Sequence, residues 1–346
     1  MRVLQIADYQ ISDESIPFVI AEVGHNHQGS IELCERIFDA AAVAGAHAVK
    51  LQKRFNETLY TPDFFNSPYQ GPTSFGETYG LHRKALEFDF DQYKHLQKYA
   101  QGKGLIFFAT AFDFKSVDFL QKLGAPAMKL ASGDLKSIPL IRYAQKTDIP
   151  LIMSTGGSTW ADIDLALASV NPKKVGILQC TAAYPAEAEN MDLRVIESLR
   201  KRYPETVIGL SSHDRGIAFS TVAAALGARI IEKHFTLDRA MKGTDHAFSL
   251  EPTGLSKLVR DLALVVKALG NGEKKFHDVE KDGIRKMGKM MVFSKSLPSG
   301  HIITAEDLEI RSPMDGVSAA AWDNVIGRRL LQKVQALEPL RIETLE

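Results

Sequence analysis

The sequence predicts an α/β protein, a (β/α)8 or TIM barrel followed by a small C-terminal domain. Short apolar runs alternate with helical patterns as far as residue 235, and buried parallel strands have this continuous apolar character. Small residues around a glycine, at 44–46, 123–125 and 226–228, come just before a strand, where glycine commonly ends a helix. A chain of 346 residues, 45% of them hydrophobic, is long enough to bury a barrel core.

The eight strands have similar lengths and composition. We expect them at residues 18–23, 48–51, 105–110, 127–130, 151–154, 175–180, 207–210 and 230–233. The first helix is expected at 30–44 with Ser30 as its N-cap, and the last amphipathic helix of the barrel at 255–268. A doubly wound open sheet is the alternative, but no G-x-G-x-x-G motif follows the first strand.

Two of these strands end in a histidine. The run at 207–214 reaches His213 and the run at 230–236 reaches His234, with a crossover helix expected between them. Neighbouring parallel strands bring such residues together at their carboxyl ends, where barrels place their chemistry. The two imidazoles could share a divalent metal, or they could be hydrogen-bonded structural histidines.

The other strand ends carry charged and hydroxyl side chains. Lys50 and Gln52 alternate along one strand and therefore point to the same side, and Lys129 follows on another strand. Charges inside a barrel are costly unless they are paired or bind a ligand, so two lysines at one mouth favour an anionic substrate. For each lysine alone, a salt bridge to a neighbouring carboxylate is the alternative. Backbone donors of the turn at 154–157 could add to an anion site.

Outside the strands, the segment at 56–85 is a turn-rich insertion with many aromatic residues. We expect an ordered lid or a subunit contact there, because long loops on the catalytic face are usually functional. The barrel domain is expected at 1–275, a charged linker at 276–289, and a second domain at 290–346 with strands near 290–294 and 341–343.

Charge and cysteine content exclude some classes of protein. Lys+Arg and Asp+Glu both number 42, so neither nucleic acid nor a membrane surface is expected as a partner. The two cysteines, Cys34 and Cys180, are too few for a disulfide framework. The N-terminal residues lack the apolar core of a signal peptide, and a cytoplasmic location is expected.

The strand-end motifs resemble those of the sialic acid synthase family, the N-acetylneuraminate and related nonulosonic acid synthases. The motifs are IAEVGHNHQG at 20–29, VKLQ at 49–52, KLASGD at 129–134, STG at 154–156, GLSSH at 209–213 and EKHFT at 232–236. In the tail, 291–308 and 325–328 are similar to the antifreeze-like (SAF) domain, a β-clip fold. Six motifs in order at successive strand ends make the resemblance specific.

The resemblance implies a transferase that condenses phosphoenolpyruvate with an N-acylmannosamine-type sugar. The products would be a nine-carbon 2-keto sugar acid and phosphate. His213 and His234 would hold a divalent ion, Mn²⁺ first and Mg²⁺ or Co²⁺ as alternatives, which would polarise the sugar aldehyde. Glu22 would bind sugar hydroxyls and transfer protons, and Glu232 would orient the metal site or act as a base.

By the same resemblance, the remaining site residues divide between the two substrates. Phosphoenolpyruvate would contact Lys50, Gln52, Thr110, Lys129, Ser132, Ser154 and Ser211. The sugar would contact Glu22, Asp134, Tyr184, Asp245 and Arg311. Family members are dimers in which each antifreeze-like domain covers the barrel of the other subunit, so a domain-swapped homodimer is expected.

The sequence departs from the family pattern at the sugar end. Ala182 replaces an asparagine, and Asp134 stands where glutamate is frequent. In the tail, either Arg311 takes the task of the usual arginine from a shifted register or that contact is absent. Losing a polar contact changes substrate choice, so the acceptor could also be unsubstituted mannose or a diacetamido-trideoxy hexose. Another aldolase of the same barrel, such as a Kdo-8-phosphate-type synthase, and a non-catalytic carbohydrate- or ice-binding protein are the more distant alternatives.

Overall fold

The computed structural model describes residues 1–346, which form two compact units, Met1–Gly270 and Asn271–Glu346. The first unit contains a closed barrel of eight parallel strands in the order β10-β3-β4-β5-β6-β7-β8-β9. This confirms the (β/α)8 prediction. The strands are β3 (Phe18–Gly24), β4 (Ala48–Lys53), β5 (Ile106–Ala111), β6 (Met128–Leu130), β7 (Leu151–Ser154), β8 (Val175–Cys180), β9 (Val207–Ser212) and β10 (Ile230–His234).

Several strands continue past their expected ends into polar residues. In β9 and β10, the pairs Ser211–Glu232 and Ser212–Lys233 are still in ladder register. The apolar runs therefore underestimated the length of these strands, because the backbone hydrogen-bond ladder continues at the barrel mouth where the side chains are polar.

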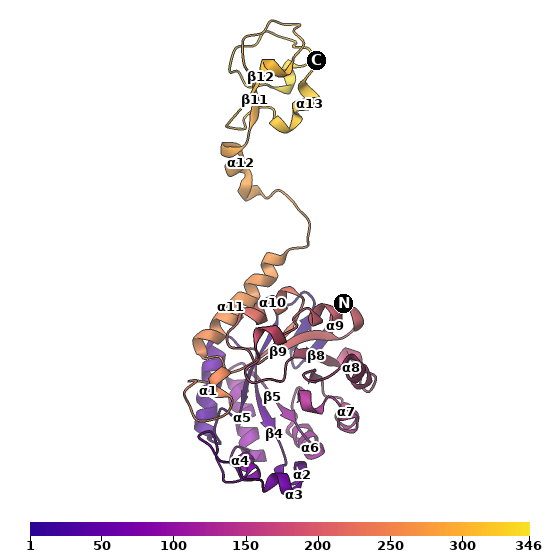
Figure 1. Cartoon of the computed structure of the whole chain (residues 1–346), viewed down its shortest axis with the longest axis vertical. Helices are drawn as coiled ribbons and strands as arrows, with labels where there is room; N and C mark the ends of the chain where they lie inside the picture. Colours follow the sequence, from indigo (N-terminus) through magenta and orange to yellow (C-terminus); the bar gives the residue numbers. More distant parts are fainter. The chain divides into compact units, whose positions relative to one another are not determined.

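Helices surround the barrel (Figure 1). The Ser30 side chain accepts a hydrogen bond from the Leu33 amide at 3.1 Å and caps the first helix, as predicted. Gly124 ends a later helix in the left-handed conformation, with φ 71°. The surrounding helices are α1 (Ile31–Val43), α5 (Phe90–Gly102), α6 (Phe114–Leu123), α7 (Ile138–Gln145), α8 (Trp160–Leu167), α9 (Val195–Arg202), α10 (Ala218–Ala225) and α11 (Pro252–Leu269).

The inside of the barrel changes from apolar to polar along each strand. In β3, Phe18 and Ile20 lie in a buried apolar cluster, and Glu22 on the same face lines a cavity. An N-terminal hairpin, β1 (Val3–Ile6) and β2 (Tyr9–Ser12), adds apolar side chains to that cluster and closes the amino end of the barrel. The hairpin was not predicted, since its strands have only four residues each. Polar side chains therefore gather at the opposite, carboxyl end.

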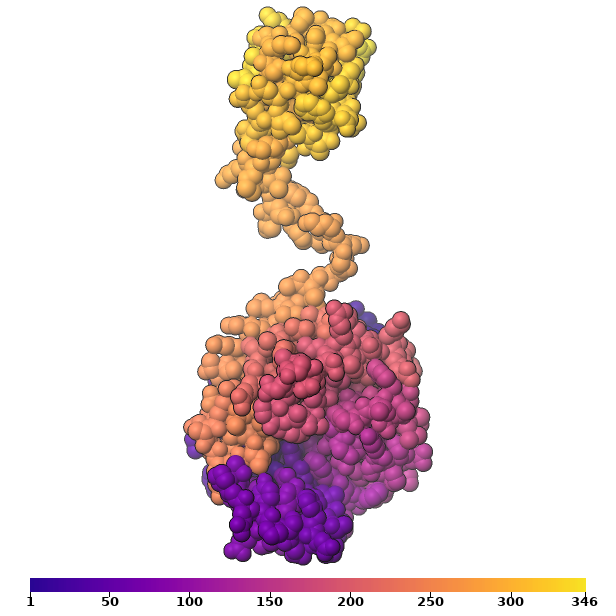
Figure 2. All heavy atoms as spheres, viewed as in Figure 1, coloured from indigo at the N-terminus to yellow at the C-terminus, as the bar shows by residue number.

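The insertion after β4 is ordered. It forms α2 (Asn56–Leu59), α3 (Pro62–Phe65) and α4 (Tyr79–Lys84), held together by aromatic contacts such as Phe64 with Tyr79 at 4.6 Å between ring centroids. Figure 2 shows this purple segment projecting from the barrel unit. Its last helix contributes a side chain to the lining of the cavity, so the insertion is part of the barrel mouth.

The second unit has a core of its own, which includes Met291, Phe293 and Leu340. Its elements are α12 (Lys281–Met287), β11 (Met290–Phe293), β12 (Leu308–Arg311) and α13 (Trp322–Val325). The strand expected at 341–343 is wrong, because Ile342–Thr344 form a 3-10 turn. Within the segment expected as a linker, α12 is helical and Arg285 pairs with Asp315 at 3.2 Å. Across the whole chain, no helix combines the length and apolarity needed to cross a bilayer.

Candidate active site

A cavity of about 500 Å³ opens at the carboxyl ends of the barrel strands. All the predicted site residues except Asp134 and Arg311 line it, and they come from β3, β4, β5, β6, β7, β9, β10 and the loops that follow the strands. The predicted residues in the lining are Glu22, Lys50, Gln52, Thr110, Lys129, Ser132, Ser154, Tyr184, Ser211, His213, Glu232, His234 and Asp245. Residues from seven strands and from the loops after them therefore meet in one place.

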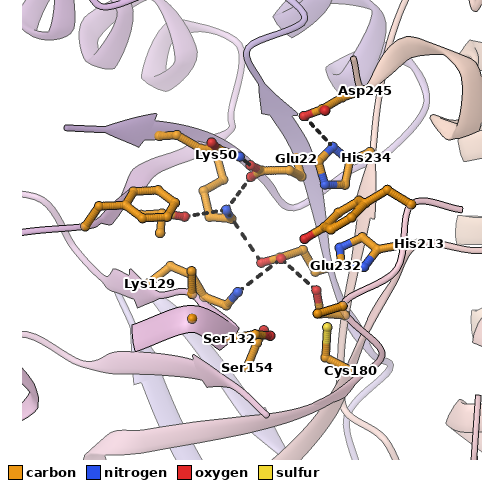
Figure 3. Close-up of a pocket in the computed structure, with 18 of the residues that line it drawn as sticks. Glu22, Lys50, Lys129, Ser132, Ser154, Cys180, His213, Glu232, His234 and Asp245 are labelled. Carbon is orange, nitrogen blue, oxygen red and sulfur yellow. Dashed lines mark hydrogen bonds and ion pairs between the residues drawn. The ribbon is translucent and has the colours of Figure 1, made fainter. Parts of the chain in front are cut away.

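Two buried lysines and two buried glutamates form the deepest part of the cavity, the floor cluster of Glu22, Lys50, Lys129 and Glu232 (Figure 3). Lys50 contacts Glu22 directly and lies 3.9 Å from Glu232. Lys129 Nζ is 3.2 Å from Glu232 Oε1. The two lysines therefore form salt bridges and also line the cavity. Cations and carboxylates balance within the cluster.

The floor glutamates differ in proton affinity. Burial raises the pKa of Glu22, although Lys50 acts against it. Burial would also raise the pKa of Glu232, but Lys129 and Lys50 together outweigh it and lower that pKa to about 2. Ser211 Oγ donates to Glu232 Oε1 at 3.0 Å and adds to the same effect. Glu232 therefore stays ionised and can stabilise a short-lived cation, whereas Glu22 more readily holds a proton.

The hydroxyl groups near the floor cluster differ in how much of their hydrogen-bonding capacity the chain uses. Ser154 Oγ is buried and has no hydrogen-bond partner within the chain, whereas Thr110 Oγ1 accepts from Lys50 at 2.7 Å. The Gly156 amide donates to Ser132 Oγ at 3.0 Å, so this donor of the 154–157 turn is already engaged. Ser154 is therefore the hydroxyl most available to a bound anion.

His213 and His234 lie side by side at the mouth, with ring centroids 5.4 Å apart. His213 Nδ1 is 2.8 Å from the Thr181 carbonyl oxygen. Because a carbonyl only accepts, Nδ1 carries the proton and Nε2 keeps its lone pair. Burial lowers the pKa of His213 to about 3 and that of His234 to about 4. Both imidazoles are neutral at pH 7, the form that binds metals.

His213 and His234 supply only part of the ligands that a metal ion needs. Neither His213 nor His234 has a third His, Cys, Asp or Glu arranged with it to complete a protein site. A buried His234 Nδ1 lacks a hydrogen bond and lies 3.5 Å from Asp245 Oδ2. An orphaned imidazole nitrogen of this kind fits a ligand role or a role as a buried acceptor. The remaining coordination positions would come from substrate and water.

Gly24 lets three polar side chains converge beside the histidines. Its φ is 54°, and a Cβ placed there would lie 3.2 Å from Gln52 Nε2 and from Glu22 Oε1, and 3.5 Å from Asp245 Oδ2. Gln52 Nε2 donates to Glu22 Oε1 at 2.8 Å. Glycine is needed here for both the backbone conformation and the close approach. Tyr184, 58% exposed, covers His213 with ring centroids 4.1 Å apart.

Two arginines in the lining were not predicted, Arg54 and Arg83. Arg54 follows Lys50 and Gln52 at the same two-residue spacing, so the alternation along β4 could have indicated it. Arg83 comes from α4 of the insertion, and no sequence signal places that helix at the mouth. Its position depends on the packing of the insertion.

Two predicted residues lie elsewhere. Asp134 ends the 3-10 turn Ser132–Asp134 after β6 and is not among the residues that line the cavity. Burial raises the pKa of Asp134 to about 7, and its Oδ2 has no hydrogen bond. Arg311 belongs to the second unit, on β12, where its guanidinium pairs with Glu309 at 2.6 Å.

Comparison with known proteins decides the family. The NeuB family matches residues 37–274 and the SAF domain matches residues 289–346. The chain belongs to the NeuB family. Its barrel and C-terminal SAF domain are those that the motifs predicted, and it is an enzyme of the transferase type.

Relatives within the family carry several different names. Human N-acetylneuraminate-9-phosphate synthase is 37% identical over 92% of this chain and 89% of its own length. The N,N'-diacetyllegionaminic acid synthase of Campylobacter jejuni is 34% identical over 90% of this chain and 94% of its own. The crystal structure of N-acetylneuraminic acid synthetase from Leptospira borgpetersenii, in complex with citrate, is 32% identical. It has a TM-score of 0.72 and covers 82% of this chain and 95% of that one.

Proposed function

We propose that this enzyme condenses phosphoenolpyruvate with the aldehyde of an open-chain acylamino sugar, giving a nine-carbon 2-keto acid and phosphate. The juxtaposition in one cavity of two buried lysines with two neutral histidines carries the proposal. The lysines suit an anionic substrate, and the histidines suit a divalent cation that would face the aldehyde. Relatives named as synthases of sialic and legionaminic acids support the class of product.

Phosphoenolpyruvate would bind at the floor cluster. Lys50 and Lys129 would meet its phosphate and carboxylate, with Ser154 and Ser211 donating hydrogen bonds. The lysines must then be shared between the substrate and their present partners, Glu22 and Glu232. Sharing two lysines in this way favours a proton on Glu22, whose pKa is already raised by burial. Substrate binding would thus prepare the general acid.

Mn²⁺ held by His213 and His234 fits the two neutral imidazoles, and Mg²⁺ or Co²⁺ are alternatives. When bound, the ion would polarise the aldehyde and lower the pKa of a water molecule. The protein itself orients the His213 ring through the Thr181 carbonyl.

Glu22 and Glu232 supply the proton donor and the proton acceptor that the proposed reaction needs. C3 of phosphoenolpyruvate attacks the aldehyde carbon, and the new alkoxide takes a proton from Glu22. Water adds to the cationic C2 and gives its proton to Glu232, whose charge also stabilises that cation. The C2–O bond to phosphate breaks, and loss of the remaining hydroxyl proton leaves the ketone.

The acceptor is expected to be an N-acylmannosamine-type sugar. Tyr184, Asp245, Gln52 and Glu22 form the polar wall beside the histidines that would bind its hydroxyls. Ala182 offers no polar group where the family pattern has asparagine, so mannose or a diacetamido-trideoxy hexose stays an alternative. A non-catalytic carbohydrate-binding protein is a weaker proposal, because a retired site would not need the balanced floor charges.

The proposal includes a homodimer and a cytoplasmic location. In the second unit, large apolar side chains such as Ile302, Ile310 and Leu331 are at least half exposed, which favours a covering role against another subunit. Sedimentation of the full chain would test the dimer. Both cysteines are free, in agreement with a reducing compartment.

Phosphate release from phosphoenolpyruvate tests the function directly. With Mn²⁺ present and a panel of mannose, N-acetylmannosamine, its 6-phosphate and diacetamido-trideoxy hexoses, one acceptor should support release, and a chelator should abolish it. His213→Ala and His234→Ala should lose at least about 100-fold in rate, while His95→Ala, an exposed histidine, should not. No release from folded, metal-loaded protein with any acceptor would contradict the proposal.

A further inference from the structure

The neighbouring strands β9 and β10 lead into the two histidines of the mouth, but their backbone pairing stops just before them. The last partners in the ladder are Ser212 and Lys233, each one residue before a histidine, His213 and His234. No ladder pairing therefore joins the two histidines to each other. The spacing of their rings, with centroids 5.4 Å apart, must be set by contacts beyond the end of the ladder.

A buried ion pair links the two segments at that point. It consists of Asp214, the residue after His213, and Lys233, the residue before His234, and we call it the brace. Lys233 Nζ donates to Asp214 Oδ1 and to the Asp214 carbonyl oxygen, both at 2.7 Å. Asp214 is 3% exposed and Lys233 is 1% exposed. The brace thus ties the two histidine-bearing segments directly to each other.

The brace lies outside the cavity. Side chains alternate along a strand, so Lys233 points to the side opposite to that of Glu232 and His234. Glu232 and His234 line the cavity, and neither residue of the brace does. The Ser212 hydroxyl also donates to Asp214 Oδ1, so two donors hold this carboxylate in place. The brace can therefore affect a ligand in the cavity only through the residues that it positions.

The backbone after His213 depends on the brace. No backbone amide donates to the Asp214 carbonyl oxygen, and Lys233 is its hydrogen-bond donor within the chain. On its other side, His213 is held by the loop after β8. The Ala186 amide donates to the His213 carbonyl oxygen at 3.2 Å, and His213 Nδ1 donates to the Thr181 carbonyl oxygen. Without the brace, the His213 segment would keep these contacts and lose its anchor to β10.

His234, in contrast, is fixed without the brace. The Leu250 amide donates to the His234 carbonyl oxygen at 2.8 Å, and the Phe235 amide donates to the Glu22 carbonyl oxygen at 2.8 Å. The end of β10 is therefore held by two other parts of the barrel. It provides a fixed point from which the brace can position the His213 segment.

We propose that Asp214 and Lys233 are positioning residues, which hold His213 at the distance from His234 at which both imidazoles can bind one divalent ion. A buried ion pair stabilises a fold little more than a well-packed apolar pair, because both charges lose their hydration. The position of this pair, directly beside both histidines, favours a role in their geometry. The inference rests on the proposed function for the metal ion.

Binding of Mn²⁺ without substrates tests the brace. The full-length enzyme is titrated with Mn²⁺, and electron paramagnetic resonance measures the free ion. The double variant Asp214→Asn/Lys233→Met removes both charges at nearly constant volume, so that no lone charge stays buried. We expect its Kd for Mn²⁺ to rise by about 10- to 100-fold, as when other groups that orient metal ligands are lost. Its melting temperature without metal should stay within about 4 °C of that of the unmodified enzyme.

The double variant Lys53→Met/Glu87→Gln is the matched control. Lys53 ends β4 and pairs with Glu87 at 2.9 Å, which makes a second buried ion pair at a strand end, and neither residue lines the cavity. This control should bind Mn²⁺ within about 2-fold of the unmodified enzyme.

Ser212→Ala gives a second test, which decides the question if the brace variant does not fold. It keeps both charges of the brace and removes one hydrogen bond to the Asp214 carboxylate. It should weaken Mn²⁺ binding by a smaller factor, about 2- to 10-fold.

Unchanged Mn²⁺ affinity in the folded brace variant would overturn the inference, and so would an equal loss of affinity in the Lys53/Glu87 control. If the brace variant is unfolded, unchanged affinity in Ser212→Ala overturns it. An unmodified enzyme that binds no Mn²⁺ would overturn the inference together with the metal assignment. The proposed reaction fails in a different way. The expected losses of Mn²⁺ affinity, without phosphate release by the unmodified enzyme with any acceptor, would keep the brace and contradict the reaction.

Discussion

The floor cluster and the rim cluster, which here means Arg54 and Arg83, each place two cations in the same cavity, but they differ in what surrounds the charge. Lys50 and Lys129 stand on barrel strands, and both contact glutamates. Arg54 and Arg83 stand on a loop and on the insertion, and their contacts are neutral. The floor lysines pair directly with carboxylates, whereas the two arginines interact with the Asp245 carboxylate without a direct salt bridge.

Because of this difference, the two clusters suit different tasks, chemistry at the floor and recognition at the rim. A self-neutral floor can lie deep in a barrel without a large cost in stability, but a substrate anion must compete with Glu22 and Glu232 for the lysines. Such competition couples binding to proton position and suits chemistry. The rim arginines form no direct salt bridge that a ligand must break, and such groups suit recognition of the outer part of a substrate.

Removing one lysine from the floor cluster should lower both the stability and the activity of the protein. Lys129→Met leaves Glu232 buried with Lys50 3.9 Å away as its remaining cation. We expect a loss of about 3–5 kcal/mol in the free energy of unfolding and no detectable activity. Urea denaturation measures the first, and phosphate release the second.

The double variant Lys129→Met/Glu232→Gln should recover most of that stability and stay inactive. Lys173→Met removes an exposed lysine that pairs with Glu205 at 3.5 Å and should cost no more than about 1 kcal/mol. If the single variant Lys129→Met were as stable as the Lys173→Met control, the floor would not depend on its internal charge balance.

Gly24 lies between the two clusters, and its replacement should uncouple them. Gly24→Ala introduces a Cβ within 3.2 Å of both Gln52 and Glu22, the links between rim and floor. Displacing these side chains should lower kcat/KM by about 100-fold, the cost of a misplacement near 1 Å. Steady-state kinetics with the preferred acceptor would measure this.

The matched control for Gly24 is Gly104→Ala. Gly104 has φ 74° and nothing within 4 Å of an added Cβ, so it shares the backbone strain without the crowding. Both variants should lose about 1 kcal/mol of stability, and only Gly24→Ala should lose activity. An equal loss of activity in both would assign the effect to strain alone.

The smallest effect concerns Asp134, whose pKa of about 7 reflects burial close to the rim. An unfolded aspartate has a pKa near 3.9, as a typical value. The folded state therefore holds the proton more tightly. The contribution of Asp134 to stability is greatest below about pH 4 and is lost as pH rises to about 7.

Asp134→Asn should flatten the pH dependence of the melting temperature between pH 4 and 8, with its largest relative gain at the upper end. Thermal unfolding across that range measures it. Asp192→Asn, at an exposed aspartate, should leave the profile unchanged. A variant profile parallel to that of the unmodified protein would show that Asp134 ionises normally.

The barrel and most of its mouth could be predicted because the signal is local. Each strand repeats an apolar run that ends in a polar residue, and parallel topology collects those ends. Lys50 and Gln52 were predicted to share a side from spacing alone, and both line the cavity. The same spacing extends to Arg54, which the prediction did not include.

Arg83 and Asp134 show where such reasoning stops. Arg83 reaches the cavity because Phe64, Tyr79 and their neighbours fold the insertion back over the mouth, an arrangement of contacts between residues without a periodic pattern. Asp134 belongs to a motif that predicts a site residue, but of its 3-10 turn only Ser132 and Gly133 line the cavity. The strand expected at 341–343 was wrong, since a run of three residues with Ile342 as its one apolar member does not fix a strand.

The N-terminal hairpin has a consequence for kinetics. Because β1 and β2 close the amino end of the barrel, the cavity is blind-ended, and everything that enters or leaves passes the mouth beside the insertion. A ligand at the floor cannot escape past one that sits above it. Under the proposed function, phosphoenolpyruvate must therefore be the first substrate to bind. The sugar follows as the second.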